Sequence, residues 1–247
     1  MIETKQIAFF FERYQAFTST WIKVDIAKYG QFILSYGKRV NKIKTELKEN
    51  AIDYNIFEVL NIKRKETITH TPFLTDLLNP KGRHYQEDLF LRAFIKALLE
   101  KHPNYENMVS FDTTEIDVIE EKSTKHGRID IFIHSKERDN EFVIIIENKI
   151  DAEDQYRQLE RYWRYARETL QLNEKQIVLI YLNKRVKRPS DDSMNINLRN
   201  RLEQEGIIFY LSYLRDIQNL LTNTNQLVKS NNIKQIIIQY LQIIKNF

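Results

Sequence analysis

The hydrophobic pattern of the chain predicts helices separated by short apolar runs. Apolar and aromatic residues recur every three or four positions from Ile7 to about Glu49, which predicts a long N-terminal helix that could break near Gly30. Its aromatic stripe could stack on bases, although such a stripe is more often a packing surface. Further helical patterns cover residues 53–60, 71–79, 85–101, 151–170, 217–221 and 233–244.

Apolar runs predict strands at residues 111–121, 128–135, 142–149, 177–182 and 207–211. The run at 142–146 is apolar at five consecutive positions, which is typical of a strand with both faces covered. It leads directly into Glu147 and Lys149, which share one face because side chains alternate along a strand. We expect the neighbouring strand to bring Asp130 close to both. Two buried carboxylates and an ammonium are costly unless they hold a cation or each other.

A helix is predicted immediately after this strand. Asp151 is a candidate N-cap, with Asp154 three residues later as in a capping box. Gln155, Gln158 and Tyr162 then fall on one stripe of the helix, beside an apolar stripe that should pack on the sheet. A structural ion pair at the strand end is the alternative interpretation of the charged residues, and it leaves this polar stripe unexplained.

These residues resemble the motif of the PD-(D/E)XK nuclease superfamily. The matching positions are Asp130, then Glu147-x-Lys149 after an apolar strand. Gln158-x-x-x-Tyr162 is similar to the QxxxY motif of the recombination-exonuclease branch.

More narrowly, residues 127–162, together with the upstream segment 70–84, resemble an uncharacterised bacterial family of that superfamily. The resemblance covers residues 57–166. It departs from the pattern at Ile129, where the superfamily name has proline, and at residues 86–87, where the family usually has small side chains.

The resemblance implies a restriction-endonuclease-like α/β fold. Its α-β-β-β-α-β core is a mixed sheet flanked by helices, and this chain adds N-terminal and C-terminal helices. We expect one nuclease-like domain over 1–247, with a helical N-terminal segment at 1–66, the core at 67–211 and C-terminal helices at 212–247. The strands at 128–135 and 142–149 should pair antiparallel and bring Asp130 and Glu147 within reach of one metal ion.

The resemblance also implies a metal site for Mg²⁺ or Mn²⁺. Its expected ligands are Asp130, Glu147 and the backbone carbonyl of Asn148. Glu87 is a further candidate, because many superfamily members supply a carboxylate from the first core helix. A first-turn acid that complements the helix dipole is an equally open explanation for Glu87. Lys149 should orient the attacking water and stabilise the transition state.

The remaining candidates concern the substrate. Gln158 and Tyr162, with Gln155, would hydrogen-bond the scissile phosphate or position the lysine. Histidines at two positions of the family pattern could contact phosphate or support the site. Four basic residues in the loop after the fourth strand could bind phosphates without sequence readout, although a solvated loop is an equally open interpretation. These candidates are His70, His84, Lys184, Arg185, Lys187 and Arg188.

Composition adds limits rather than a function. The chain has 247 residues and no cysteine, which excludes disulfides and thiolate metal sites. No signal sequence and no apolar run of membrane-spanning length are found, so we expect a soluble cytoplasmic protein. A net charge of +4 permits nucleic-acid binding.

We therefore expect a metal-dependent nuclease acting on nucleic acid, in the first place DNA, in defence or DNA processing. The alternative is a catalytically inactive module of the same fold that binds nucleic acid or protein. The sequence does not distinguish DNA from RNA, single from double strands, or endonuclease from exonuclease. Sequence preference, pathway and oligomeric state are equally open.

Overall fold

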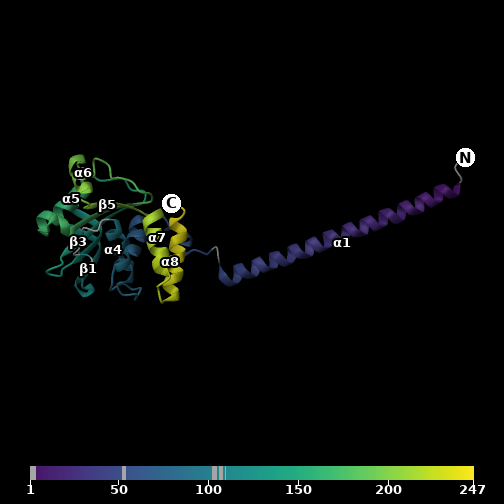
Figure 1. Ribbon diagram of the computed structural model, residues 1–247, viewed down its shortest axis with the longest axis horizontal. Helices are drawn as coiled ribbons and strands as arrows, with labels where there is room; N and C mark the ends of the chain where they lie inside the picture. The colour runs from purple at the N-terminus through teal and green to yellow at the C-terminus, as the bar shows by residue number, and fades with distance from the viewer. Residues whose placement is uncertain (1–3, 52–53, 102–104, 106–107, 109) are drawn as a thin grey trace. The chain divides into compact units, whose positions relative to one another are not determined.

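The computed structural model describes residues 4–51, 54–101, 105, 108 and 110–247, which separate into two compact units, Met1–Tyr54 and Asn55–Phe247 (Figure 1). The first unit is a single helix, α1 (Thr4–Asn50), which continues through Gly30 without a break. Its large apolar side chains are exposed, including those of the aromatic stripe that was expected to be a packing surface. The unit boundary at residue 54 lies earlier than the predicted boundary at 66.

The second unit contains a five-stranded sheet with helices on both faces. No helix in the described part of the chain is long and apolar enough to cross a membrane. The elements in chain order are α2 (Ile56–Val59), η1 (Glu66–His70), α3 (Thr71–Leu78), α4 (Leu89–Lys101), η3 (Thr113–Glu115), β1 (Ile116–Thr124), β2 (Gly127–Ser135), β3 (Phe142–Lys149), α5 (Gln158–Arg164), η4 (Tyr165–Thr169), η5 (Glu174–Gln176), β4 (Ile177–Asn183), α6 (Ile196–Gln204), β5 (Ile208–Ser212), η6 (Tyr213–Ile217), α7 (Gln218–Asn225) and α8 (Asn231–Ile244).

The strands follow one another across the sheet in the order β1-β2-β3-β4-β5. β2 pairs antiparallel with both β1 and β3, whereas β4 pairs parallel with both β3 and β5. Every residue of β3 is buried, as expected for a central strand with covered faces. The mixed sheet and its flanking helices confirm the predicted restriction-endonuclease-like α/β fold.

Each face of the sheet has its own hydrophobic core. On one face, α3, α4, α7 and α8 pack against strand residues such as Ile131, Ile144 and Ile180. On the other face, α5 and α6 cover residues such as Phe132 and Ile145. Alternate residues of β3, and of β2 from Ile131 onward, therefore belong to different cores, which places the polar end of β3 between two well-packed layers.

Several predicted boundaries are wrong, each for a local reason. The predicted strand at 111–121 starts at Ile116, because the Asp112 side chain accepts a hydrogen bond from the Thr114 amide and makes a turn. The predicted helix at 53–60 is only α2, whose N-cap is the Asn55 side chain. Asp53, at which that helix was predicted to start, lies outside the described residues.

The helix predicted at 151–170 starts at Gln158 and passes at Tyr165 into a turn of π-helix. Asp151 does not cap it, because its carboxylate pairs with Arg64 and Lys184 at 2.6 Å each. Asp154 likewise accepts hydrogen bonds from the Tyr181 hydroxyl and the Ser190 amide, at 2.7 Å each. These tertiary contacts hold both aspartates in the loop before the helix.

Candidate active site

The pairing of β2 with β3 brings the two predicted carboxylates together. The paired residues of β2 and β3 end with Ile131 opposite Ile146, and Asp130 and Glu147 are the next residues of the two strands. The charge of Asp130 helps to raise the pKa of Glu147, so the two carboxylates lie close together. Asp130 also accepts a hydrogen bond on Oδ2 from the Asn148 amide at 2.8 Å. The acidic pair is thus built from neighbouring strands of one hairpin.

Glu147 is buried beside its ion-pair partner Lys149. Its side chain is 1% exposed, and neither carboxylate oxygen receives a well-aligned hydrogen bond from the described residues. Burial and the charge of Asp130 raise the pKa of Glu147 to about 8. Burial also raises the pKa of Asp130 to about 6, against the hydrogen bond from Asn148. Native proteins rarely leave a buried carboxylate in this state, and each such group calls for an explanation.

Lys149 compensates part of this charge. Its Nζ lies 2.8 Å from Oε1 of Glu147, and the two side chains form a buried ion pair. Burial is the largest single effect on the pKa of Lys149 and lowers it, but the charge and hydrogen bonding of Glu147 together with the charges of Glu66 and Asp130 make the net shift upward. The lysine is therefore held protonated at neutral pH.

Asn148 points to the opposite face of β3. Its Nδ2 donates to Oγ1 of Thr71 at 2.9 Å, and its Oδ1 accepts from the Tyr213 hydroxyl at 2.9 Å. The side chain is fully buried. The Asn148 side chain thus links β3 to α3 and η6. Asn148 can therefore contact the acidic pair only through its backbone.

Gln158 and Tyr162 lie next to each other on α5. Gln158 Nε2 donates to the Tyr162 hydroxyl at 3.1 Å, and that hydroxyl donates to the backbone carbonyl of Arg128. Both side chains are buried, and burial and the charge of Glu147 raise the pKa of Tyr162, so its hydroxyl stays protonated. Gln155 is exposed in the loop before the helix and accepts a hydrogen bond from Arg161.

A third acid near the pair is Glu66, which the sequence analysis missed. Glu66 in η1 accepts a hydrogen bond on Oε2 from the Ile150 amide at 2.7 Å, just beyond β3. Its charge acts on Asp130, Glu147 and Lys149. Burial raises the pKa of Glu66 as well. Glu66 lies in a charged run without hydrophobic periodicity. In the sequence, only its position four residues before His70 could have marked it as a site residue.

Glu87 lies outside the helix from which it was expected to reach the acidic pair. It was expected to look inward from a helix at 85–101, but α4 begins only at Leu89. Glu87 precedes that helix with a left-handed backbone (φ 54°) and an exposed side chain. The acid that does act on the pair comes from η1, an element upstream.

The two histidines are structural in their contacts. His70 is fully buried, with Nδ1 2.8 Å from the Tyr240 hydroxyl and Nε2 2.9 Å from the Lys63 carbonyl. In His84, Nε2 contacts the Asn79 carbonyl and Nδ1 accepts from the Gln86 amide. Both ring nitrogens of each histidine are occupied, so the expected phosphate contacts are not supported by this geometry.

The basic loop after β4 borders a cavity of about 740 Å³ at the end of the sheet where β3 and β4 finish. Lys184 and Arg188 are paired with Asp151 and a glutamate of α6. Arg185 and Lys187 are exposed and form no ion pair within the described residues. The cavity wall also contains the loop that follows Lys149, so an occupant would lie beside the end of β3.

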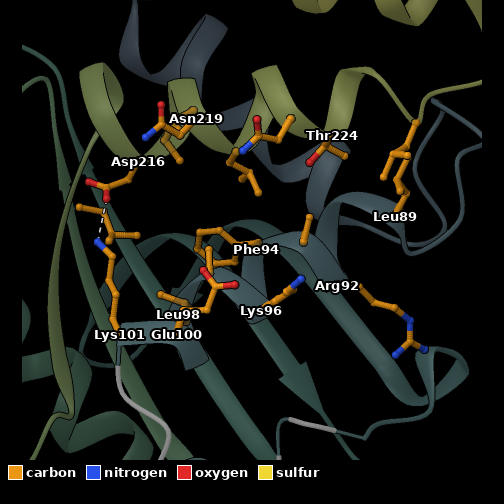
Figure 2. Close-up of a pocket in the computed structure, with 17 residues that line it drawn as sticks. Leu89, Arg92, Phe94, Lys96, Leu98, Glu100, Lys101, Asp216, Asn219 and Thr224 are labelled. Carbon is orange, nitrogen blue, oxygen red and sulfur yellow. Dashed lines mark hydrogen bonds and ion pairs between the residues drawn. The ribbon is translucent and has the colours of Figure 1, made fainter.

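A second cavity, of about 660 Å³, lies between α4 and α7 (Figure 2). Figure 2 shows apolar side chains such as Phe94 and Leu98 at its base and the ion pair between Lys101 and Asp216 at one end. None of its lining residues belongs to the acidic pair or its neighbours. This groove is therefore separate from the candidate site.

Comparison with models of protein families identifies the family of this chain. A family model described as PD-(D/E)XK nuclease superfamily matches residues 54–242. The chain belongs to the PD-(D/E)XK nuclease superfamily. No curated protein and no solved structure gives a match. The matched region nearly coincides with the second compact unit, and α1 lies outside it.

PD-(D/E)XK nucleases typically use divalent metal ions, and the residues here fit one. Asp130 and Glu147 extend from neighbouring strands, Lys149 contacts Oε1 of Glu147, and Oε2 has no partner in hydrogen-bonding geometry among the described residues. No group of three His, Cys, Asp or Glu among the described residues could hold a metal alone. Mg²⁺ usually takes one or two carboxylates and fills its shell with water and phosphate. A two-carboxylate site suits that ion better than zinc, which takes a closed set of protein ligands.

Proposed function

We propose that this protein is a cytoplasmic nuclease that uses Mg²⁺ or Mn²⁺ to hydrolyse phosphodiester bonds of nucleic acid, in the first place DNA. The observation that carries the proposal is the buried Glu147 carboxylate, which lies close to the Asp130 carboxylate and has Lys149 as its ion-pair partner. Burying such a set costs folding free energy. Binding of a metal ion and a phosphate would offset that cost. Membership of a nuclease superfamily suggests that these residues serve phosphodiester hydrolysis.

Asp130 and Glu147 would hold the metal ion, with the backbone carbonyl of Asn148 as a third ligand. A bound divalent ion would neutralise charge on the phosphate and make an attacking water available at neutral pH. The hydrogen bond from the Asn148 amide fixes one oxygen of Asp130, which leaves the other oxygen for the ion. Packing of β3 between two cores keeps both carboxylates in position.

Lys149 would act as a fixed positive charge. Because Glu147 raises the pKa of Lys149, the ammonium stays protonated and cannot abstract a proton from water at neutral pH. We assign it to orienting the attacking water and to stabilising the charge that develops on the phosphate. Loss of one such electrostatic group commonly lowers the rate by a factor of about 10²–10³.

Gln158 and Tyr162 would act as positioning residues. The Tyr162 hydroxyl donates to the carbonyl of Arg128, two residues before Asp130 on β2. Gln158 in turn donates to that hydroxyl. The pair would therefore fix the start of β2, and with it the direction of the aspartate. Tyr162→Phe should lower the cleavage rate while the Mg²⁺ requirement and the fold persist.

The test compares the purified full chain with Glu147→Gln, which removes the charge and keeps the shape. Circular and linear DNA, single-stranded DNA and RNA are incubated with Mg²⁺, with Mn²⁺ and with EDTA. We expect metal-dependent cleavage by the wild type and a loss of at least about 10²-fold in the variant. Glu120→Gln, an exposed acid on β1, is the matched control and should retain activity. Equal cleavage by Glu147→Gln and wild type would show that the site is elsewhere.

Metal binding is measured separately by thermal unfolding. Mg²⁺ should raise the unfolding temperature of the wild type by mass action and leave that of Glu147→Gln unchanged. Asp130→Ala should behave like Glu147→Gln. Binding of DNA without cleavage in either metal, and without a metal-dependent shift, would favour the inactive nucleic-acid-binding module.

A further inference from the structure

The helix α1 carries a second pattern that the nuclease unit does not explain. From residue 22 onward its apolar residues alternate at spacings of four and three, which is the heptad pattern of coiled coils. The side chains of this seam are exposed or half-buried. The seam consists of Ile22, Ile26, Tyr29, Ile33, Tyr36, Val40, Ile43 and Leu47.

The heptad assignment separates the seam from a polar far side. In a heptad, d follows a by three residues and the next a follows d by four. The a positions of the seam are therefore Ile26, Ile33, Val40 and Leu47. Three of these four are β-branched, which is common at a in parallel two-stranded coiled coils, and the d positions carry isoleucine and tyrosine in place of leucine. The positions farthest from the seam are mostly lysine, glutamine, serine, asparagine and threonine. A narrow seam of period 3.5 matches another helix rather than a lipid surface, which needs a broad apolar face.

Two glycines point to what the partner is. Gly30 and Gly37 lie seven residues apart within the helix, although glycine in a helix interior costs about 0.5–1 kcal/mol relative to alanine. A Cβ added at either position would meet nothing within 4 Å, so no contact inside the chain requires them. Both occupy the e position beside the seam. In a parallel pair each e residue faces the g residue five positions earlier in the other helix.

The g residue that faces Gly37 in such a pair is Phe32. Phe32 is a large exposed side chain, and a second copy of the helix in register would set it over the surface that Gly37 leaves open. This fit of large against small occurs twice in a symmetric dimer, once on each side of the seam. A second copy of the same helix in register supplies this fit on both sides of the seam.

The area of the seam is sufficient for a stable dimer. A buried isoleucine or tyrosine side chain removes on the order of 100 Å² from water. Eight seam residues therefore bury on the order of 800 Å² per chain, which matches the ~800 Å² per partner of standard interfaces. We propose that α1 pairs with α1 of a second copy of this chain as a parallel two-stranded coiled coil through this seam.

The test uses two neighbouring residues of equal exposure. Ile33 lies in the seam and Leu34 lies outside it, and each is 67% exposed in the single chain. Sedimentation of the full-length protein should show a dimer for the wild type and for Leu34→Lys. Ile33→Lys should raise the dimer dissociation constant at least about 100-fold. Lysine is a good helix former, so circular dichroism should show unchanged helix content in both variants.

Orientation is tested by cross-linking, because the chain contains no cysteine of its own. A cysteine at an a position of a parallel pair meets its copy at disulfide distance. Ile33→Cys should therefore oxidise to a covalent dimer, and Leu34→Cys should not. A monomeric wild type at ~100 μM, equal loss of the dimer in Leu34→Lys, or a dimer that Ile33→Cys fails to cross-link would each overturn the proposal.

Discussion

Glu66 holds the backbone just beyond β3 while its charge acts on the acidic pair. Its Oε2 accepts from the Ile150 amide, and its charge helps to raise the pKa values of Asp130 and Glu147. A partner of this kind orients metal ligands, and its loss typically weakens metal affinity or activity by 10–100-fold. The sequence could not identify it, because a lone acid in a short charged turn has no periodic neighbours.

We expect Glu66→Gln to raise the Mg²⁺ concentration required for half-maximal cleavage by about 10–100-fold. The amide keeps an oxygen for the Ile150 hydrogen bond but removes the negative charge. Cleavage rates measured over a series of Mg²⁺ concentrations provide the check, with Mg²⁺-dependent thermal stabilisation as a second readout. Glu58→Gln, an exposed glutamate on α2, is the control. An unchanged Mg²⁺ requirement would remove Glu66 from the site.

His70 makes stability depend on pH. Burial lowers the pKa of His70 to about 4, from an ordinary value of 6.5. Below pH 6.5 the unfolded chain therefore binds a proton that the folded protein refuses, and stability falls as the pH falls from 6.5 towards 4. Above pH 6.5 this residue has no effect on the pH dependence.

We expect the wild type to lose about 1–2 kcal/mol more free energy of unfolding between pH 7 and pH 5 than His70→Gln does. Urea unfolding at the two pH values measures both differences. The absolute stability of the variant is unimportant, because only the two pH-dependent changes are compared. Equal losses would mean that His70 is not the group responsible.

At the scale of elements, β3 was predictable because its apolar run and the charged end follow simple alternation. The boundaries of α5 were not, because Asp151 and Asp154 bind side chains and a backbone amide from distant segments instead of capping the helix. The same holds for α4, whose predicted first turn is replaced by residues with positive φ at Tyr85 and Glu87. Local pattern identified the elements, whereas tertiary hydrogen bonds decided where they start.

Asn148 joins β3 to two elements distant in the sequence. Replacement by leucine would leave the Thr71 and Tyr213 hydroxyls without this buried partner, and each orphaned group costs roughly 1–3 kcal/mol. We expect Asn148→Leu to lower the free energy of unfolding by about 2–5 kcal/mol in urea titrations. Tyr213→Phe removes only one of the two contacts and should cost less. A larger loss in Tyr213→Phe than in Asn148→Leu would contradict this account of β3.

At the scale of the molecule, nucleic acid would have to approach the end of the sheet where β3 and β4 finish. Arg185 and Lys187 are the exposed cations of that edge that lack ion pairs in the described part of the chain. Lys184 and Arg188, grouped with them in the sequence, are held by acidic partners. The sequence could place all four in one loop, but it could not show which of them are already paired.

Each phosphate contact contributes about 0.9 to the slope of log affinity against log salt on duplex DNA. We expect Arg185→Gln combined with Lys187→Gln to reduce that slope by about 1.8, measured by DNA binding of the Glu147→Gln protein. Lys175→Gln with Lys229→Gln, on exposed positions elsewhere, should leave the slope as it is. An unchanged slope in the first pair would exclude this loop from the binding surface.

The hairpin that carries the acidic pair also sets the order in which the chain can assemble. β2 and β3 are joined by residues 136–141 alone, whereas α5 and β4 must close longer loops. Local contacts form sooner than distant ones. Asp130 and Glu147 should therefore come together early in folding, before α5 packs Tyr162 against the sheet. The repulsion between the two carboxylates then raises the free-energy barrier to folding. If Mg²⁺ binds the acidic pair as proposed, it should accelerate refolding of this protein as well as stabilise its folded state, so the ion would change the rate of folding and not only the equilibrium.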